Sequence, residues 1–142
     1  MALQLTSEQL KSIAQDLESG MVCFYHIKTG EVESYPNDLD DSYAEYWQDV
    51  LDKINAGIAD YIRFDVPTDH ESFCFMADFA NDLADEDMRD RFIAALQKRK
   101  PFQQFKSLLN YYPDMLEEWY KYRSLCFIRY VKEIVEVRNL QS

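Results

Sequence analysis

Glycine is scarce in this chain, with three residues among 142, Gly20, Gly30 and Gly57. Loops that cradle nucleotide phosphates place several glycines within a few positions of one another, and the sequence has no such run. The nucleophile-elbow pattern GxSxG and the zinc-binding pattern HExxH are absent too. The sequence therefore lacks the motifs of nucleotide-binding folds, α/β-hydrolases and zinc proteases, and it predicts no cofactor and no metal site.

Cysteine is also sparse. The chain has an odd number of cysteines, Cys23, Cys74 and Cys126, which lie far apart and form no CxxC pair. This pattern indicates neither a disulfide framework nor a structural zinc site, and it favours reduced, buried thiols in a reducing compartment. No run approaches the ~18 consecutive apolar residues of a membrane span. The N-terminal MALQLTSEQL lacks the basic and apolar regions of a signal peptide. We therefore expect a cytoplasmic protein that makes no contact with a membrane.

Positive charge is in the minority, because 15 Lys and Arg face 26 Asp and Glu and give a formal net charge of −11. Phosphate backbones attract Lys and Arg, so this balance disfavours a nucleic-acid or anionic-membrane binder as a whole molecule. The distribution is uneven: residues 1–88 hold 4 basic and 20 acidic side chains, and residues 89–142 hold 11 basic and 6 acidic ones. Either the two parts pair their charges with each other, or the basic part meets an anion or an acidic partner.

Capping residues and glycines predict the first elements. Thr6, with Gln9 at the N3 position, forms a capping box for a helix that ends at Gly20. Two strands follow, MVCFYHI and EVESY, joined by a short loop with Gly30 at the position that requires a positive φ. The first strand is apolar on both faces, so we expect it to be central or covered.

A second helix is predicted to begin at Asp40–Ser42 and to end at Gly57. Its apolar residues recur at helical spacing, namely Tyr43, Tyr46, Trp47, Val50, Leu51 and Ile54. The segment YIRFDV then alternates like a half-buried strand, with one face made by Ile62, Phe64 and Val66.

The remainder is predicted to be helical, with helix starts at Thr68 (boxed with Glu71), Asp85, Pro101 and Pro113. The order of elements predicts an α+β fold, in which helices cover a small antiparallel sheet of about three strands and form the C-terminal half. No Gly-, Ser- or Pro-rich linker divides the chain, so we expect one domain over residues 1–142.

Three stretches carry a resemblance to a known family: ESFxxMxDF at 71–79, DEDxRxRxxxAL at 85–96 and RKPFxxFK at 99–106. Together with the hairpin GMVCFYHIKTGE, they resemble the bacterial group described as uncharacterised protein family (UPF) 0158. The match covers most of the chain and is strongest from about Glu71 to Arg123. The resemblance implies no activity and assigns no catalytic residue.

The segment RKPFQQFK is the candidate binding surface, through Arg99, Lys100, Phe102, Phe105 and Lys106. Cations interleaved with aromatic rings are typical of single-strand nucleic-acid platforms and of protein hot spots. The alternative is structural, because two Phe three positions apart have core spacing and cations suit a helix C-terminus.

Three tyrosines, Tyr111, Tyr112 and Tyr122, lie off the main apolar stripe of the C-terminal helices. Either they form an exposed patch that binds a partner or a second copy of the chain, or they cover helix junctions with their hydroxyls in water.

Two further groups of residues are weaker candidates for a functional site. His70 and Cys74 share a helix face, and a Cys–His pair can generate a thiolate nucleophile, but a buried, inert thiol is the preferred interpretation. Asp38, Asp40 and Asp41 resemble the start of a calcium loop, but the glycine and glutamate of that loop are missing. Helix capping explains them better.

We therefore expect a small acidic interaction or regulatory domain without catalytic activity, whose partner is another protein or a second copy of itself. The alternative is single-strand nucleic-acid binding through RKPFQQFK, which the net charge disfavours through long-range repulsion. A hydrolase that uses a carboxylate cluster or the His70–Cys74 pair is the third hypothesis.

Overall fold

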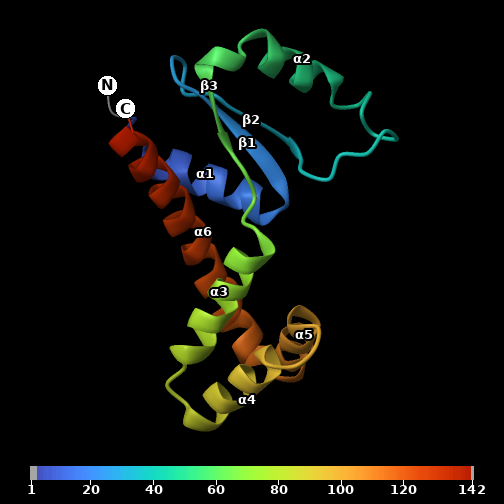
Figure 1. Cartoon of the computed structure of the whole chain (residues 1–142), viewed down its shortest axis with the longest axis vertical. Coiled ribbons are helices and arrows are strands. Elements are labelled where there is room, and N and C mark those ends of the chain that lie inside the picture. The colour runs from blue at the N-terminus through green and yellow to red at the C-terminus, as the bar shows by residue number, and fades with distance from the viewer. Residues whose placement is uncertain (1–2, 142) are drawn as a thin grey trace. The chain divides into compact units, whose positions relative to one another are not determined.

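The computed structural model describes residues 3–141, and these pack as two compact units (Figure 1). The first unit contains the chain up to Val66 and from Phe127 onward, and the second contains Pro67–Cys126. The described residues form six α-helices, one short 3-10 helix and a three-stranded antiparallel sheet. The predicted α+β class is therefore confirmed. The expectation of a single domain stays a prediction.

The sheet of the first unit has the order β2-β1-β3, with β1 at Met21–His26, β2 at Val32–Pro36 and β3 at Tyr61–Phe64. Both neighbours run antiparallel to β1. The central position of β1 explains why its middle residues are buried on both faces, as its continuous apolar run predicts. Gly30 has a φ of +76° in the loop between β1 and β2, which confirms the predicted hairpin.

Two helices cover opposite faces of this sheet (Figure 1). On one face α1 (Ser7–Glu18) packs against β1, where the Cys23 Sγ lies 3.8 Å from the backbone oxygen of Ile13. On the other face α2 (Gln48–Ala56) places Ile54 in a buried cluster with Val22 and Phe24. The alternation of side chains along β1 thus divides the core of the first unit between the two helices.

The start of α1 follows its predicted capping box. The Gln9 amide nitrogen donates to Thr6 Oγ1 at 3.1 Å, and the Thr6 amide donates to Gln9 Oε1 at 2.9 Å. These two bonds satisfy donors that have no partner inside the helix. Gly20 follows the helix with a φ of +86°, as predicted.

The predicted start of α2 is wrong. The helix begins at Gln48, and residues 41–47 form successive turns. The Asp40 side chain accepts from the Ser42 amide at 2.9 Å, which offers the backbone a turn in place of a helix. Tyr43 and Tyr46 are consequently 65% and 80% exposed and take no part in a helical stripe. The predicted stop at Gly57 is confirmed.

After α2, a 3-10 helix (Ile58–Asp60) leads into β3. Ile62 and Phe64 are buried as predicted, but the strand ends at Phe64, so the inclusion of Val66 is wrong. The Asp65 backbone oxygen accepts a 2.9 Å hydrogen bond from the Tyr130 hydroxyl of α6 (Pro113–Gln141). The same helix places Asn139 against Leu3 through two hydrogen bonds of 2.7 and 3.0 Å.

The second unit consists of α3 (Asp69–Asn81), α4 (Glu86–Leu96), α5 (Pro101–Tyr111) and the first part of α6. The capping box of Thr68 and Glu71, the Asp85 cap and the helix starts at Pro101 and Pro113 are all confirmed. One buried cluster joins these helices, made of Met76, Phe79, Ala80, Phe92, Leu96, Phe105, Leu109 and Trp119.

Candidate interaction surface

Helices α4 and α5 form a helical hairpin with a short connection. The Asp85 side chain accepts from the Met88 amide at 3.1 Å and begins α4. The chain turns back after Leu96, passes through Lys100 in the left-handed region at φ 55°, and starts α5 with Pro101 in the first turn. Phe92 and Phe105 hold the hairpin together, with ring centroids 5.4 Å apart.

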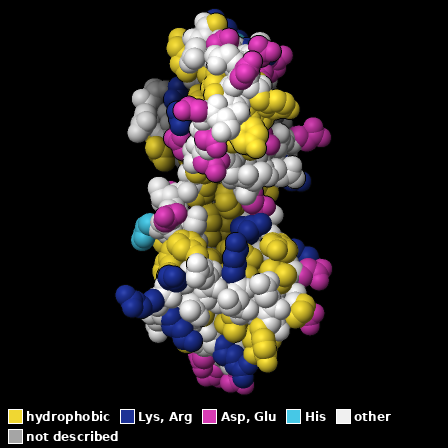
Figure 2. Space-filling view, turned by 90° about the vertical axis from the view of Figure 1, so that its right-hand side faces the viewer, with side chains coloured by type: hydrophobic (Ala, Val, Ile, Leu, Met, Phe, Trp, Pro, Cys, Tyr) yellow, Lys and Arg dark blue, Asp and Glu magenta, His cyan; other side chains and the backbone are white. Residues whose placement is uncertain are grey.

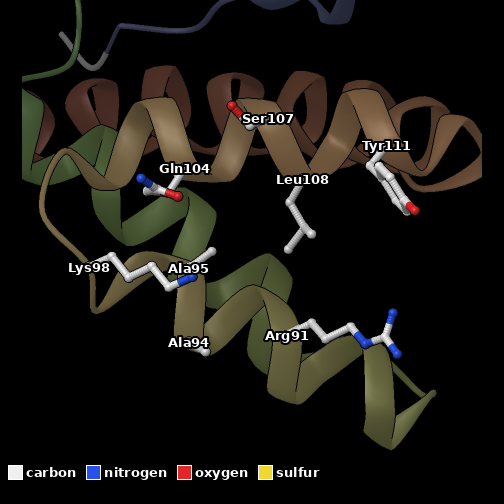
Figure 3. A pocket seen from close by; sticks show the side chains of 8 residues that line it. All are labelled: Arg91, Ala94, Ala95, Lys98, Gln104, Ser107, Leu108 and Tyr111. Carbon is white, nitrogen blue, oxygen red and sulfur yellow. The ribbon is translucent and has the colours of Figure 1, made fainter.

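An open hollow of about 370 Å³ lies between these two helices (Figure 3). Each helix contributes residues at positions i, i+3, i+4 and i+7, which share one helix face. The stripe on α4 is Arg91, Ala94, Ala95 and Lys98, and the stripe on α5 is Gln104, Ser107, Leu108 and Tyr111. The middle of the hollow is thus lined by small or apolar side chains, and polar groups stand at both ends.

Figure 3 shows how the two ends differ. Lys98 and Gln104 lie at the end next to the connecting loop, and Arg91 and Tyr111 lie at the opposite end, where the helices diverge. The two cations are seven positions apart on α4, which corresponds to about 10.5 Å along a helix. An occupant therefore meets positive charge at both ends and an apolar floor between them.

The stretch of sequence that contributes the lining residues is basic, although the protein as a whole is acidic. Residues 91–113 contain five cations and no Asp or Glu, the cations being Arg91, Lys98, Arg99, Lys100 and Lys106. Within residues 3–141, none of these five forms an ion pair. By contrast, Lys53 pairs with Glu33 at 2.6 Å, and Arg63 pairs with Asp65 at 2.6 Å. Figure 2 shows Lys and Arg side chains spread over the face of the second unit that it displays.

Arg91 is held in place by aromatic contacts. Its guanidinium donates to the Tyr112 hydroxyl and lies 5.8 Å from the centre of the Tyr112 ring. Tyr111 and Tyr112 meet edge to face at 5.1 Å. A guanidinium positioned by a ring keeps its full charge and loses less conformational freedom when it binds an anion.

The residues proposed for the RKPFQQFK surface differ in their exposure to solvent. Arg99, Lys100 and Lys106 are exposed, and Phe102 is 39% exposed. Phe105 is only 1% exposed and contacts Phe79, Phe92 and Trp119, so its assignment to a binding surface is corrected. Although Phe102 and Phe105 are three positions apart on α5, packing against the neighbouring helices buries only Phe105.

The three tyrosines do not form one exposed patch. Tyr111 is 78% exposed at the open end of the hollow. Tyr112 is half-buried under Arg91, and Tyr122 is half-buried beside Trp119 and donates to Asp82 at 3.2 Å. Burial, followed by the hydrogen bond to Asp82, raises the pKa of Tyr122 to about 12. Of these three tyrosines, Tyr111 is therefore the one that is largely exposed.

The expectation that Cys74 is a buried thiol is wrong. The side chain is half-buried, and its Sγ lies 3.7 Å from the Nε2 of His70. Cys23 and Cys126 are buried as predicted. Burial and the neighbouring Asp16 raise the pKa of the Cys23 thiol.

The aspartates before α2 act as turn residues. Asp40 accepts from Ser42, and Asp38 and Asp41 are exposed. Across residues 3–141, no three His, Cys, Asp or Glu side chains gather into a group that could hold a metal ion.

Most of the residues that line the hollow were missed by the sequence analysis. The sequence leaves two alternatives for Tyr111, an exposed patch or a helix junction, and it predicts no role for Arg91, Gln104 or Ser107. The i, i+3, i+4, i+7 spacing of Arg91, Ala94, Ala95 and Lys98 is visible in the sequence. Its partner stripe on α5 becomes recognisable only once the hairpin brings the two helices together.

Residues 24–141 match the family described as uncharacterised protein family UPF0158. The chain belongs to this family. Among curated proteins it is similar to UPF0158 protein PA5073 of Pseudomonas aeruginosa, with 31% identity over 71 residues, which cover 50% of this chain and 46% of that protein. The alignment thus spans about half the length of this relative.

No solved structure matches the chain. Its resemblance to the UPF0158 family is confirmed, and the match includes both α4 and α5. None of the helices within residues 3–141 combines the length and the apolar character needed to cross a membrane.

Proposed function

We propose that this UPF0158 protein is a non-catalytic interaction domain that binds an acidic protein partner through the hollow between α4 and α5. One observation carries the proposal: an open, apolar-floored hollow has a cation at each end, Arg91 and Lys98, and neither forms an ion pair within residues 3–141 of a protein whose net charge is −11. Such an arrangement combines an apolar centre with a charged rim, as protein interfaces do. It favours partners of opposite charge.

The burial of Phe105 supports a protein partner over a nucleic acid. Single-strand platforms use several exposed rings on which successive bases stack. With Phe105 in the core, Phe102 is the exposed ring left in RKPFQQFK, and the floor of the hollow is made by Ala94, Ala95 and Leu108. Nucleic-acid binding through Arg99, Lys100, Phe102 and Lys106 remains the second candidate, favoured only by the exposed cations.

We propose that the protein is cytoplasmic and catalyses no reaction. No disulfide joins Cys23, Cys74 and Cys126 in the described chain, which supports a reducing compartment. The His70–Cys74 contact is the strongest argument for an enzyme. A thiolate nucleophile, however, also needs a third group that orients the histidine, and none contacts His70 in residues 3–141.

The test compares proteins captured from the source organism by the wild type and by the double variant Arg91→Glu and Lys98→Glu. The control is Lys132→Glu with Arg138→Glu, which changes the net charge equally at exposed positions of α6 outside the hollow. We expect an acidic protein that the wild type and the control retain, that the hollow variant loses, and that elutes as the salt concentration rises.

Two results would overturn the proposal. Capture of the same proteins by all three forms would show that the hollow is not used. Wild-type binding to mixed single-stranded oligonucleotides at low salt, abolished by Arg99→Glu with Lys100→Glu, would instead support the second candidate.

A further inference from the structure

We infer that the segment which fills the hollow is an amphipathic α-helix of the partner, with carboxylates about seven positions apart and small or apolar residues between them. This inference rests on the proposed function, because it describes the segment through which the acidic partner would bind. The hollow, its two stripes and its charge carry the argument.

The shape of the hollow suits a third helix. The stripes on α4 and α5 both repeat at i, i+3, i+4 and i+7, so one face of each helix lines the hollow over about two turns. Small side chains occupy the centre of these stripes, at Ala94, Ala95 and Ser107. They allow the backbone of a third helix to approach closely, and Leu108 offers it an apolar contact.

The distance between the two cations of the α4 stripe sets the spacing expected for the carboxylates of the occupant. Arg91 and Lys98 stand at the two ends of the α4 stripe, about 10.5 Å apart along the helix. A partner helix that runs along this stripe presents carboxylates over the same distance when they are two turns apart. Arg99 and Lys100 follow Lys98 in the connection between α4 and α5, so the end of the occupant that lies next to this connection is expected to be the more acidic.

An extended peptide fits the same hollow less well. A strand rises about 3.3 Å per residue, so it passes from one cation to the other in about three residues and offers fewer side chains to the apolar centre than a helix does. Strand addition also needs an unpaired sheet edge, whereas the backbone here is helical on both sides. The helix-in-groove mode, with anchors at helical spacing, uses the features that this surface offers.

The experiment uses synthetic, fluorescently labelled 16-residue peptides and the full chain. The test peptide is an Ala- and Leu-rich helix with Glu pairs seven positions apart on its apolar face. The first control peptide has the same composition with the Glu moved to the opposite face. The second contains central prolines, which prevent a helix but keep the charge. Binding is measured by anisotropy at low salt, and backbone amide NMR shifts locate the site.

We expect the test peptide to bind at least tenfold more tightly than either control peptide. Its amide shifts should centre on Ala94, Ala95 and Leu108. Lys98→Glu should weaken binding about tenfold, and it avoids the contact that Arg91 makes with Tyr112. Ser107→Trp should block the peptide by filling the hollow without changing the charge, and Lys132→Glu should leave binding unchanged.

The outcomes separate the inference from the function on which it rests. If the proline peptide binds as tightly as the helix and Lys98→Glu weakens both, the acidic-partner function holds and the helical occupant is wrong. If no peptide binds, or if the shifts lie away from α4 and α5, the helical occupant is also refuted, and the capture experiment decides the function on its own.

Discussion

Truncating Phe105 should unfold the second unit far more readily than truncating Phe102, although both residues lie on α5. Phe105 is 1% exposed and contacts the rings of Phe79, Phe92 and Trp119 at centroid distances of 6.1, 5.4 and 5.0 Å. Removing a buried Phe side chain costs about 3–5 kcal/mol, through lost transfer free energy and the cavity left behind.

The expected loss is large compared with the stability of a small domain, which is about 5–15 kcal/mol. At a urea dependence of about 2 kcal/mol per molar, a loss of ~4 kcal/mol lowers the midpoint by ~2 M. Phe102 is 39% exposed, so Phe102→Ala should cost less than about 1 kcal/mol. This variant is a matched control, because the chemical change and the helix are the same.

The assay is urea unfolding followed by tryptophan fluorescence in a Trp47→Phe background. The chain has two tryptophans, and this background leaves Trp119, which is 7% exposed in the core of the second unit. Equal shifts for Phe105→Ala and Phe102→Ala would refute the placement of Phe105 in the core. They would also restore the nucleic-acid platform as a serious hypothesis.

Three other predictions concern caps, thiols and a tyrosine. Thr68→Ala removes the acceptor of the Glu71 amide bond (3.1 Å) and should cost about 1 kcal/mol in chemical unfolding. Iodoacetamide should modify half-buried Cys74 first, as mass spectrometry of the peptides can show, because burial raises the pKa of Cys23 and shields it. The raised pKa of Tyr122 means that the folded state favours the neutral phenol, so the free energy of unfolding should fall as the pH rises above 10.0 through about 12. Tyr122→Phe should reduce that loss, as alkaline unfolding curves can show.

Each of these predictions has a clear contrary result. The cap assignment fails if Thr68→Ser, which keeps the hydroxyl, destabilises as much as Thr68→Ala. Labelling of Cys23 as fast as Cys74 in the folded protein would contradict the burial of Cys23. Identical alkaline unfolding of the wild type and Tyr122→Phe would show that Tyr122 does not carry the pH dependence.

The predictable parts of the fold are those that depend on a few neighbouring residues. Thr6 and Gln9, Gly30, Thr68 and Glu71 each act within one turn, and each boundary that they predict is confirmed. The predicted start of α2 is wrong because the prediction rests on apolar spacing alone, which does not include the competing turn at Asp40. Tyr43 and Tyr46 fit a helical pattern and are nevertheless exposed.

The candidate site was predictable only in part. The proposed RKPFQQFK surface includes Arg99 and Lys100 in the connection between α4 and α5, but helical spacing does not distinguish the buried ring of Phe105 from the 39% exposed ring of Phe102. That distinction depends on which face of α5 meets α4, a tertiary fact that side-chain spacing within one helix does not contain.

Site-specific photo-crosslinking in living cells tests the central claim most directly. A photoreactive phenylalanine at Ala94 lies within the hollow, and the same residue at Lys132 lies on the exposed face of α6 and serves as the control. The account predicts a discrete adduct with an acidic protein from position 94, absent from position 132 and lost when Lys98→Glu is added. No adduct at position 94, an equal adduct at both positions, or an adduct that nuclease removes would contradict it.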